Sequence, residues 1–255
     1  MDLKNALYIV SIPIGNPDDI TLRAIKVLTD VDILVCEEYR NGSRLMKQLG
    51  IKDKKIITTT MRREEERCIL ALEEAETGAD VAFICSGDAG VYGMAGLIYE
   101  TAQDYPDVEI QVIPGVTAAL SGAARLGAPL IHDFALISLS DLMTSWEKIQ
   151  KRLRMAAEGD FAIVLYNPSS RKRADYLQKA CDILLETLSP DQICGTVRNI
   201  GRDGEETHIY TLAELRDVQV DMFTTVFIGN SSTKRIGGHM VTPRGYARER
   251  KTTSF

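Results

Sequence analysis

The strongest chemical signal in the chain is a glycine-rich stretch, Ser86-Gly-Asp-Ala-Gly-Val-Tyr-Gly-Met-Ala-Gly96, that directly follows the apolar run Val81–Cys85. A strand that ends in a glycine turn and opens a helix presents free backbone N–H groups where α/β sheets bind ligands. The spacing excludes both familiar nucleotide motifs, because the chain has no G-x-x-x-x-G-K-[ST] and G-x-x-G-x-x-G is not G-x-G-x-x-G. Asp88 lies where a phosphate would be bound, which favours a ligand with hydroxyls or positive charge. The alternative is a tight turn that only packs a helix on a sheet.

Two further loops follow apolar runs in the same manner. Pro114-Gly-Val-Thr-Ala-Ala119 follows Val108–Ile113, and Tyr166-Asn-Pro-Ser-Ser170 ends the run that begins at Phe161. Each loop alone is weak evidence for a site. Together, three strand ends with small or hydrogen-bonding residues predict one ligand site.

The elements that would position these loops follow from the apolar pattern. Short runs rich in β-branched residues suit strands buried on both faces, and they span Leu7–Ile12, Ile33–Cys36, Val81–Cys85, Val108–Ile113, Phe161–Tyr166 and Thr225–Ile228. Helical spacing is found in Arg63–Thr77, Trp146–Ala157 and Ala174–Leu188. Strands that alternate with helices predict an α/β fold with a largely parallel sheet.

A break after the first five such units predicts two α/β domains. Gly127 and Pro129 end a helix of small residues, and a fresh run begins at Phe134. The second half is more mixed, with one short helix at Leu212–Val218 among the strand candidates Gln192–Val197, Thr207–Thr211 and Met222–Ile228. We therefore expect an N-terminal domain at 1–127, a C-terminal domain at 132–246 and a tail at 247–255, with the ligand cleft between the two domains.

Composition narrows the class of protein. The 255 residues carry 36 acidic and 30 basic side chains, for a formal charge of −6, and 45% are hydrophobic. This balance gives no general positive field for nucleic acid, and no apolar run approaches the roughly 18–20 residues of a membrane span. Five cysteines without a C-x-x-C pair and three scattered histidines argue against a disulfide framework and a bound metal. We expect a cytoplasmic protein with neither a membrane partner nor a metal.

Seven stretches then carry a family resemblance: SGDAGVYGMAGL, IPGVTAALSGAARLGAP, HDFALISLSDLMTSWEKIQKRL, FAIVLYNPSSRKR, VRNIGRDGEE, DMFTTVFIGNSST and VTPRGY. With them, the chain from about Met61 to Tyr246 resembles the tetrapyrrole (precorrin) methylase family. Within it, the chain looks like the branch that methylates C17 of precorrin-3B or cobalt-precorrin-3B, with ring contraction, in cobalamin synthesis. The resemblance implies two α/β domains of the class III methyltransferase type around a cleft for S-adenosylmethionine, and a homodimer.

The first fifty residues resemble another branch of the same family. Residues 11–23, 36–40 and 43–46 are similar to the 16S ribosomal RNA cytidine 2′-O-methyltransferases, which share the fold and the donor. Methylation of ribosomal RNA is therefore the alternative function. A third reading is a ligand-binding protein that keeps the donor pocket without transferring methyl groups.

The resemblance also implies the residues of the donor site. From the N-terminal domain these are Gly87, Asp88, Ala89, Val91, Tyr92, Thr117 and Ala118. From the C-terminal domain they are Tyr166, Asn167, Asn199, Ile200, Thr224 and Thr225. Methyl transfer from a sulfonium is an in-line displacement with a neutral leaving group, so it needs alignment more than an acid or a base. We therefore name no catalytic residue.

A precorrin carries many carboxylates, which predicts a local basic trough on an otherwise acidic surface. The candidate cations are Arg23, Arg40, Arg44, Arg62, Arg63, Arg171, Lys172 and Arg173, and the 171–173 cluster is favoured; for each one, a solvated surface cation is the alternative. The resemblance implies that Pro13, Gly15 and Asn16 belong to an N-terminal loop that helps form the substrate trough. We expect Asp18 and Asp19 to cap a helix that starts at Ile20. His132 is either a proton carrier or, as we favour, a hydrogen-bonded junction residue.

Overall fold

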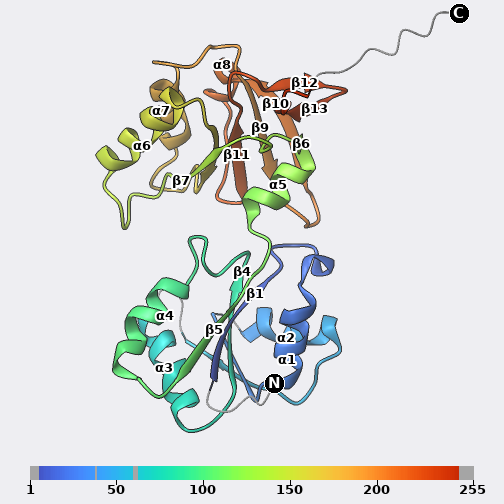
Figure 1. Ribbon diagram of the computed structural model, residues 1–255, viewed down its shortest axis with the longest axis vertical. Coiled ribbons are helices and arrows are strands. Elements are labelled where there is room, and N and C mark those ends of the chain that lie inside the picture. Colours follow the sequence, from blue (N-terminus) through green and yellow to red (C-terminus); the bar gives the residue numbers. More distant parts are fainter. Residues whose placement is uncertain (1–5, 38, 60–62, 247–255) are drawn as a thin grey trace, which may run out of the picture. The chain divides into compact units, whose positions relative to one another are not determined.

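The computed structural model describes residues 6–37, 39–59 and 63–246, with the side chains of Arg40 and Asn41 outside that description. The chain forms two compact units, Met1–Ala118 and Ala119–Phe255. Each has its own sheet (Figure 1) and its own apolar core. No helix among the described residues is long and apolar enough to cross a membrane.

The first unit is built on a five-stranded sheet of order β3-β2-β4-β1-β5. Every strand pair in it is parallel. The strands are β1 (Ala6–Ile12), β2 (Ile33–Cys36), β3 (Lys55–Thr58), β4 (Val81–Ser86) and β5 (Glu109–Ile113). The helices are α1 (Leu22–Asp30), α2 (Tyr39–Leu49), α3 (Glu64–Glu76) and α4 (Ala95–Thr101), with short 3₁₀ turns at η1 (Pro17–Asp19) and η2 (Ala102–Asp104). This unit confirms the predicted α/β fold.

Strand β1 is buried on both faces because helices cover both sides of the sheet. Leu7 and Ile9 pack with α3 and α4 in one apolar cluster, whereas Tyr8 and Val10 pack with α1 and α2 in another. Successive side chains of a strand point to opposite faces, so a continuous apolar run serves both cores.

The second unit holds a mixed sheet of order β10-β9-β11-β8-β7. Its strands are β7 (Phe134–Ser138), β8 (Ala162–Tyr166), β9 (Ile193–Arg198), β10 (Glu206–Thr211) and β11 (Thr224–Ile228). Its helices are α5 (Ala118–Leu126), α6 (Trp146–Glu158), α7 (Tyr176–Leu184) and α8 (Leu212–Leu215). A small sheet joins β12 (Lys234–Ile236), β13 (His239–Val241) and β6 (Gly127–Ala128).

Helix α5 packs on the second sheet, although the sequence places it in the first domain. A Cβ atom on Gly122 would lie 2.8 Å from Cζ of Phe227, and one on Gly195 would lie 2.6 Å from Cδ2 of Leu126. These two glycines let the helix approach β9 and β11 closely. The compact units accordingly divide after the first residue of α5, between Ala118 and Ala119, whereas the domain boundary at 127–132 stays a prediction. The predicted tail, 247–255, lies outside the described residues.

Candidate functional site

The loops after β1 and β4 are joined by hydrogen bonds at the end of the first sheet where the carboxyl ends of its strands lie. We call this end the carboxyl edge of the sheet. The N–H of Gly87 donates to the carbonyl of Ile12 at 2.8 Å. The N–H of Ala89 donates to Oγ of the buried Ser11 at 3.0 Å. Strands β4, β1 and β5 are neighbours in a parallel sheet, so the loops that follow them meet at one edge.

Asp88 holds these loops together through both oxygens of its carboxylate. Oδ1 accepts the N–H of Gly90 at 2.9 Å, and Oδ2 accepts the N–H of Gly115 at 2.9 Å. A carboxylate oxygen has more than one lone pair, so this negative charge can still face a ligand. Asp88 therefore has a structural role that the sequence pattern did not reveal.

Close backbone packing explains two of the glycines at this edge. A Cβ atom on Gly115 would lie 2.3 Å from the carbonyl oxygen of Gly87, and one on Gly93 would lie 2.5 Å from that of Ala89. Ala89 and Thr117 are buried within these loops, whereas Tyr92 is 57% exposed. The first unit therefore brings together the N-terminal candidates for the donor site.

The second sheet likewise gathers its candidate residues at one edge. Strand β7 is parallel to β8, and β11 is antiparallel to both β8 and β9. The carboxyl ends of β7, β8 and β9 therefore lie beside the amino end of β11. In register, Ser138 is opposite Tyr166 and Thr224 is opposite Arg198. The C-terminal donor candidates share this edge: Tyr166, Asn167, Asn199, Ile200, Thr224 and Thr225.

Unusual backbone conformations coincide with the candidate positions. Of the five non-glycine residues with positive φ in the described part of the chain, three are Tyr92, Asn167 and Asn199, each at 52°. Such conformations cost of order 1–3 kcal/mol and cluster at ligand sites. Side-chain hydrogen bonds hold both asparagines: Asn167 donates to Oγ of Ser138 at 2.9 Å, and Asn199 donates to the carbonyl of Gly204 at 3.3 Å.

Two further interactions fix this edge. The hydroxyl of Tyr166 accepts the N–H of Ala119 at 2.7 Å, at the start of α5. Arg198 Nε lies 2.8 Å from Oδ2 of Asp221, whose other oxygen accepts the hydroxyl of Thr224 at 3.0 Å. Burial would raise the pKa of Asp221, but the bonds from Arg198 and Thr224 lower it overall. The ionised carboxylate thus compensates the Arg198 charge beside the candidate residues.

Comparison with known proteins identifies the family. Residues 6–216 match the family model described as Tetrapyrrole (Corrin/Porphyrin) Methylases. The chain belongs to this family. This membership agrees with the resemblance seen in the sequence motifs.

Individual members of the tetrapyrrole methylase family match nearly the whole chain. A Salmonella typhimurium protein named "Probable cobalt-factor III C(17)-methyltransferase" is 44% identical over 241 residues, which are 94% of this chain and 99% of that protein. The Precorrin-3B C(17)-methyltransferase of Sinorhizobium sp is 34% identical and covers 96% of this chain and 98% of its own. The crystal structure of the methyltransferase CobJ has a TM-score of 0.83 at 32% identity, covering 93% of this chain and 99% of its own. The uncovered parts are shorter than the segment 11–46, so each of these matches includes part of that segment.

The N-terminal substrate candidates lie after β1 in this methylase. Asn16 caps the 3₁₀ turn η1 by accepting the N–H of Asp18 at 3.1 Å. The expectation that Asp18 and Asp19 cap a helix at Ile20 is wrong, because both lie inside η1. Helix α1 instead begins at Leu22, where Thr21 Oγ1 accepts the N–H of Ala24. Pro13 and Gly15 precede these caps in the same loop.

The candidate cations differ in their surroundings. The guanidinium of Arg173 is held in place, because its Nη1 donates to Oγ of Ser140 at 2.7 Å and pairs with Oδ1 of Asp141 at 3.1 Å. Arg171 and Lys172 beside it are exposed. Arg63 pairs with Glu66 on the surface. Arg23 and Arg44 are exposed residues of α1 and α2; the side chain of Arg40 and the whole of Arg62 lie outside the described residues.

His132 is exposed, and its Nε2 lies 3.0 Å from the carbonyl oxygen of Pro243. The carbonyl belongs to the TPRGY stretch, which the sequence singled out. The contact fits the hydrogen-bonded junction role better than that of a proton carrier.

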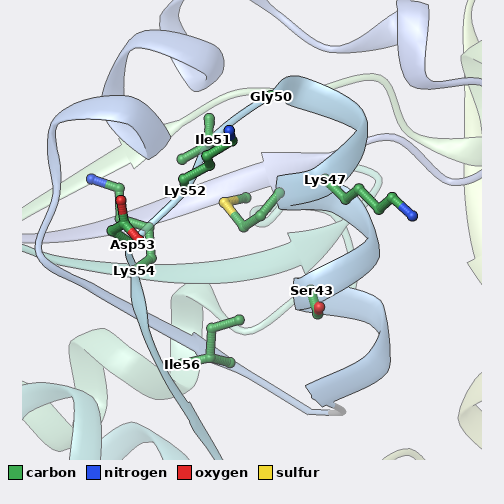
Figure 2. A pocket seen from close by; sticks show the side chains of 9 residues that line it. Ser43, Lys47, Gly50, Ile51, Lys52, Asp53, Lys54 and Ile56 are labelled. Carbon is green, nitrogen blue, oxygen red and sulfur yellow. The ribbon is translucent and has the colours of Figure 1, made fainter.

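A separate pocket lies at the opposite end of the first sheet, where the amino ends of its strands lie. Figure 2 shows it between the end of α2 and the start of β3, lined by residues from Ser43 to Ile56, with a volume of about 300 Å³. Lys54 there donates to the carbonyls of Thr29 and Val31 at the end of α1. The amino ends of parallel strands are not where α/β sheets bind their ligands, so this pocket is distinct from the candidate site.

Proposed function

We propose that this protein is an S-adenosylmethionine-dependent C-methyltransferase that methylates C17 of a precorrin-3B-type tetrapyrrole in cobalamin biosynthesis. The observation that carries the proposal is the 44% identity over 94% of the chain to a cobalt-factor III C17-methyltransferase homologue. S-adenosylmethionine is the donor used by the family. The sequence motifs and the arrangement of the two sheet edges support the same function.

We propose further that the macrocycle already carries cobalt. The identity to the cobalt-factor III protein is 44%, whereas that to the precorrin-3B enzyme is 34%. The metal would enter as part of the substrate. The ring contraction implied by the sequence resemblance stays a prediction.

The donor loops in each unit fit a cationic ligand. The N–H groups, hydroxyls and asparagine amides at the two edges supply hydrogen-bonding partners for an adenosine and an amino-acid group. In the first unit the Asp88 carboxylate adds a negative charge, which favours a sulfonium. In the second unit Asp221 compensates Arg198, so that this guanidinium does not oppose a positive ligand. On these grounds we assign the seven candidates of the first unit and the six of the second to donor binding.

The bound donor supplies an electrophilic methyl group on a sulfonium sulfur. The ring carbon provides the electron pair of the new C–C bond, and the electrons of the broken S–C bond stay on sulfur, which leaves as a neutral thioether. The residues of the protein have to hold the two reacting atoms about 3 Å apart and aligned. Loops that are held rigid by the hydrogen bonds of Asp88, Asn167 and Asn199 suit that task.

We propose a homodimer, as the sequence resemblance implies, and we propose that it acts in the cytoplasm. Methylation of ribosomal RNA is less well supported, because the chain carries a formal charge of −6 and RNA binding requires cations that neutralise phosphates. The matches to the relatives described above include part of the N-terminal segment that suggested it.

Incubation with methyl-labelled S-adenosylmethionine tests the proposal. One sample receives the cobalt-containing macrocycle under anaerobic conditions, a second the metal-free macrocycle, and a third 16S ribosomal RNA in ribosomal subunits. We expect label in the first macrocycle and less in the second. Label in RNA alone would replace the proposal with the alternative function.

A further inference from the structure

Two large apolar side chains stand out at the edge of the second sheet that carries the donor candidates. Met143 is 97% exposed, more than any other large apolar side chain in the described residues, and Leu142 beside it is 79% exposed. They lie in the loop between β7 and α6, and β7 ends beside Tyr166 of β8. We call Leu142 and Met143 the apolar tip.

The loop that carries the apolar tip is fixed before and after it. Before it, Asp141 Oδ2 accepts the hydroxyl of Tyr176 at 2.6 Å, and Oδ1 pairs with Arg173 at 3.1 Å. The bond with Tyr176 lowers the pKa of Asp141 and raises that of Tyr176, so the carboxylate stays ionised. After it, the ring of Trp146 lies 4.5 Å from that of Tyr176, centroid to centroid. The apolar tip is therefore exposed on a loop that is held in place on both sides of it.

Cations lie beside the apolar tip. The turn that contains Arg171 and Lys172 is closed by the N–H of Arg173, which donates to the carbonyl of Ser170 at 3.0 Å. Arg173 also pairs with Asp141, which directly precedes the tip. This ion pair therefore joins the turn with the exposed cations to the loop with the tip. The edge thus presents an apolar contact next to two positive charges.

We infer that the apolar tip packs against the flat face of the tetrapyrrole, while Arg171 and Lys172 bind carboxylates on its rim. This inference rests on the proposed function and adds specificity residues to it. A tetrapyrrole combines an apolar ring with charged carboxylates around it, which matches the two parts of this edge. Asp141, Arg173 and Tyr176 are positioning residues, because they hold the loop rather than contact the macrocycle.

The variants L142S and M143S, alone and combined, test the tip. Both positions are exposed, so the folded state tolerates them. Because burial of one apolar side chain is worth about a tenfold change in affinity, we expect the KM for the macrocycle to rise about tenfold in each single variant. The kcat and the dissociation constant for S-adenosylhomocysteine stay unchanged. The control is M155S, on the other end of α6, where a methionine is 58% exposed.

The variant Y176F tests the positioning role. Phenylalanine keeps the contact with Trp146 but cannot donate to Asp141, so we expect a rise in the KM for the macrocycle with the donor constant unchanged. Loss of donor binding as well would mean that Tyr176 supports the whole edge, and would overturn its assigned role.

Binding of the macrocycle without turnover, measured by its absorbance, separates the possible failures. Unchanged KM and binding in the tip variants, with an active wild-type protein, overturn the inference alone. A change in oligomeric state of these variants with unchanged macrocycle binding also overturns it, since the tip would then contact a second copy. If the wild-type protein neither binds nor methylates the macrocycle, the proposed function fails and the inference with it.

Discussion

The carboxylate of Asp88 accepts the backbone N–H of Gly115 at 2.9 Å. This bond joins the loops after β4 and β5 across the end of β1, which lies between these strands in the sheet. The other carboxylate oxygen closes the turn at Gly90. One side chain thus sets the shape of a loop assigned to the methyl donor.

Replacement of Asp88 tests this role. In D88A both N–H groups lose their partner, and in D88N the amide can accept only one of them. Hydrogen bonds to a charged group contribute about 1.5–3 kcal/mol each, so we expect D88A to bind S-adenosylhomocysteine at least tenfold more weakly, with D88N intermediate. Isothermal titration calorimetry gives the affinities. The control D107A removes an exposed carboxylate of the same unit, and equal losses in D88A and D107A would refute the role.

Two glycines of the first unit form a matched pair for stability. G115A places a Cβ 2.3 Å from the carbonyl oxygen of Gly87, whereas G96A meets nothing within 4 Å on helix α4. Overpacking costs about 1–3 kcal/mol, and alanine in a helix gains about 1 kcal/mol over glycine. Urea denaturation should therefore show opposite changes in the free energy of unfolding. A G115A protein as stable as the wild type would contradict the close packing of these loops.

Arg67 of α3 is a buried cation in the first unit. Arg67 is 4% exposed, and its Nε and Nη1 atoms have no hydrogen-bond partner among the described residues. Its Cζ lies 6.0 Å from the centroid of the Phe83 ring. Replacing a buried charge by an apolar side chain of similar length is often neutral or stabilising. We expect R67M to keep or raise the free energy of unfolding. A loss of about 3–5 kcal/mol, the size typical of a broken buried pair, would show that the guanidinium has a strong partner.

The cysteines predict the response to alkaline pH. Burial raises the pKa of Cys68 and Cys85 to about 11 and that of Cys181 to about 12. A thiol whose pKa is higher in the folded state contributes its full stability below the unfolded value of 9.0, and this stability is lost as the pH rises toward the folded value. The free energy of unfolding should fall between pH 9 and 11.

The variant C181A isolates one of these thiols, since alanine cannot ionise. Its urea midpoint should fall less steeply above pH 9 than that of the wild-type protein. Identical slopes for the two proteins would exclude the ionisation of Cys181 as a cause.

The sequence predicted those strands whose residues are buried on both faces. The expected run Ile33–Cys36 coincides with β2, and Leu7–Ile12 differs from β1 by one residue at its start. Strand β3 was missed, because Lys55–Thr58 is an edge strand with no fully buried residue and its apolar signal is only two residues long. Helix α2 was also missed, since Tyr39–Leu49 carries polar residues over most of its surface.

At the site, the loops could be predicted from the sequence, but the hydrogen bonds and ion pairs that join them could not. Glycines and asparagines next to strand ends indicate sharp turns, and the structure has such turns at Gly87, Asn167 and Asn199. The bond between Asp88 and Gly115 and the pair of Asp141 with Arg173 join residues far apart in sequence. Such pairings depend on which strands become neighbours, and no local pattern encodes that order.

The position of the transferred methyl group tests the central claim most directly. The protein is incubated anaerobically with the cobalt-containing macrocycle and S-adenosylmethionine that carries a ¹³C-labelled methyl group, and the product is analysed by mass spectrometry and NMR. We predict one labelled methyl group per macrocycle, bonded to C17. A labelled methyl on another ring carbon, or an unlabelled macrocycle with label in ribosomal RNA, would contradict the assignment as a C17-methyltransferase.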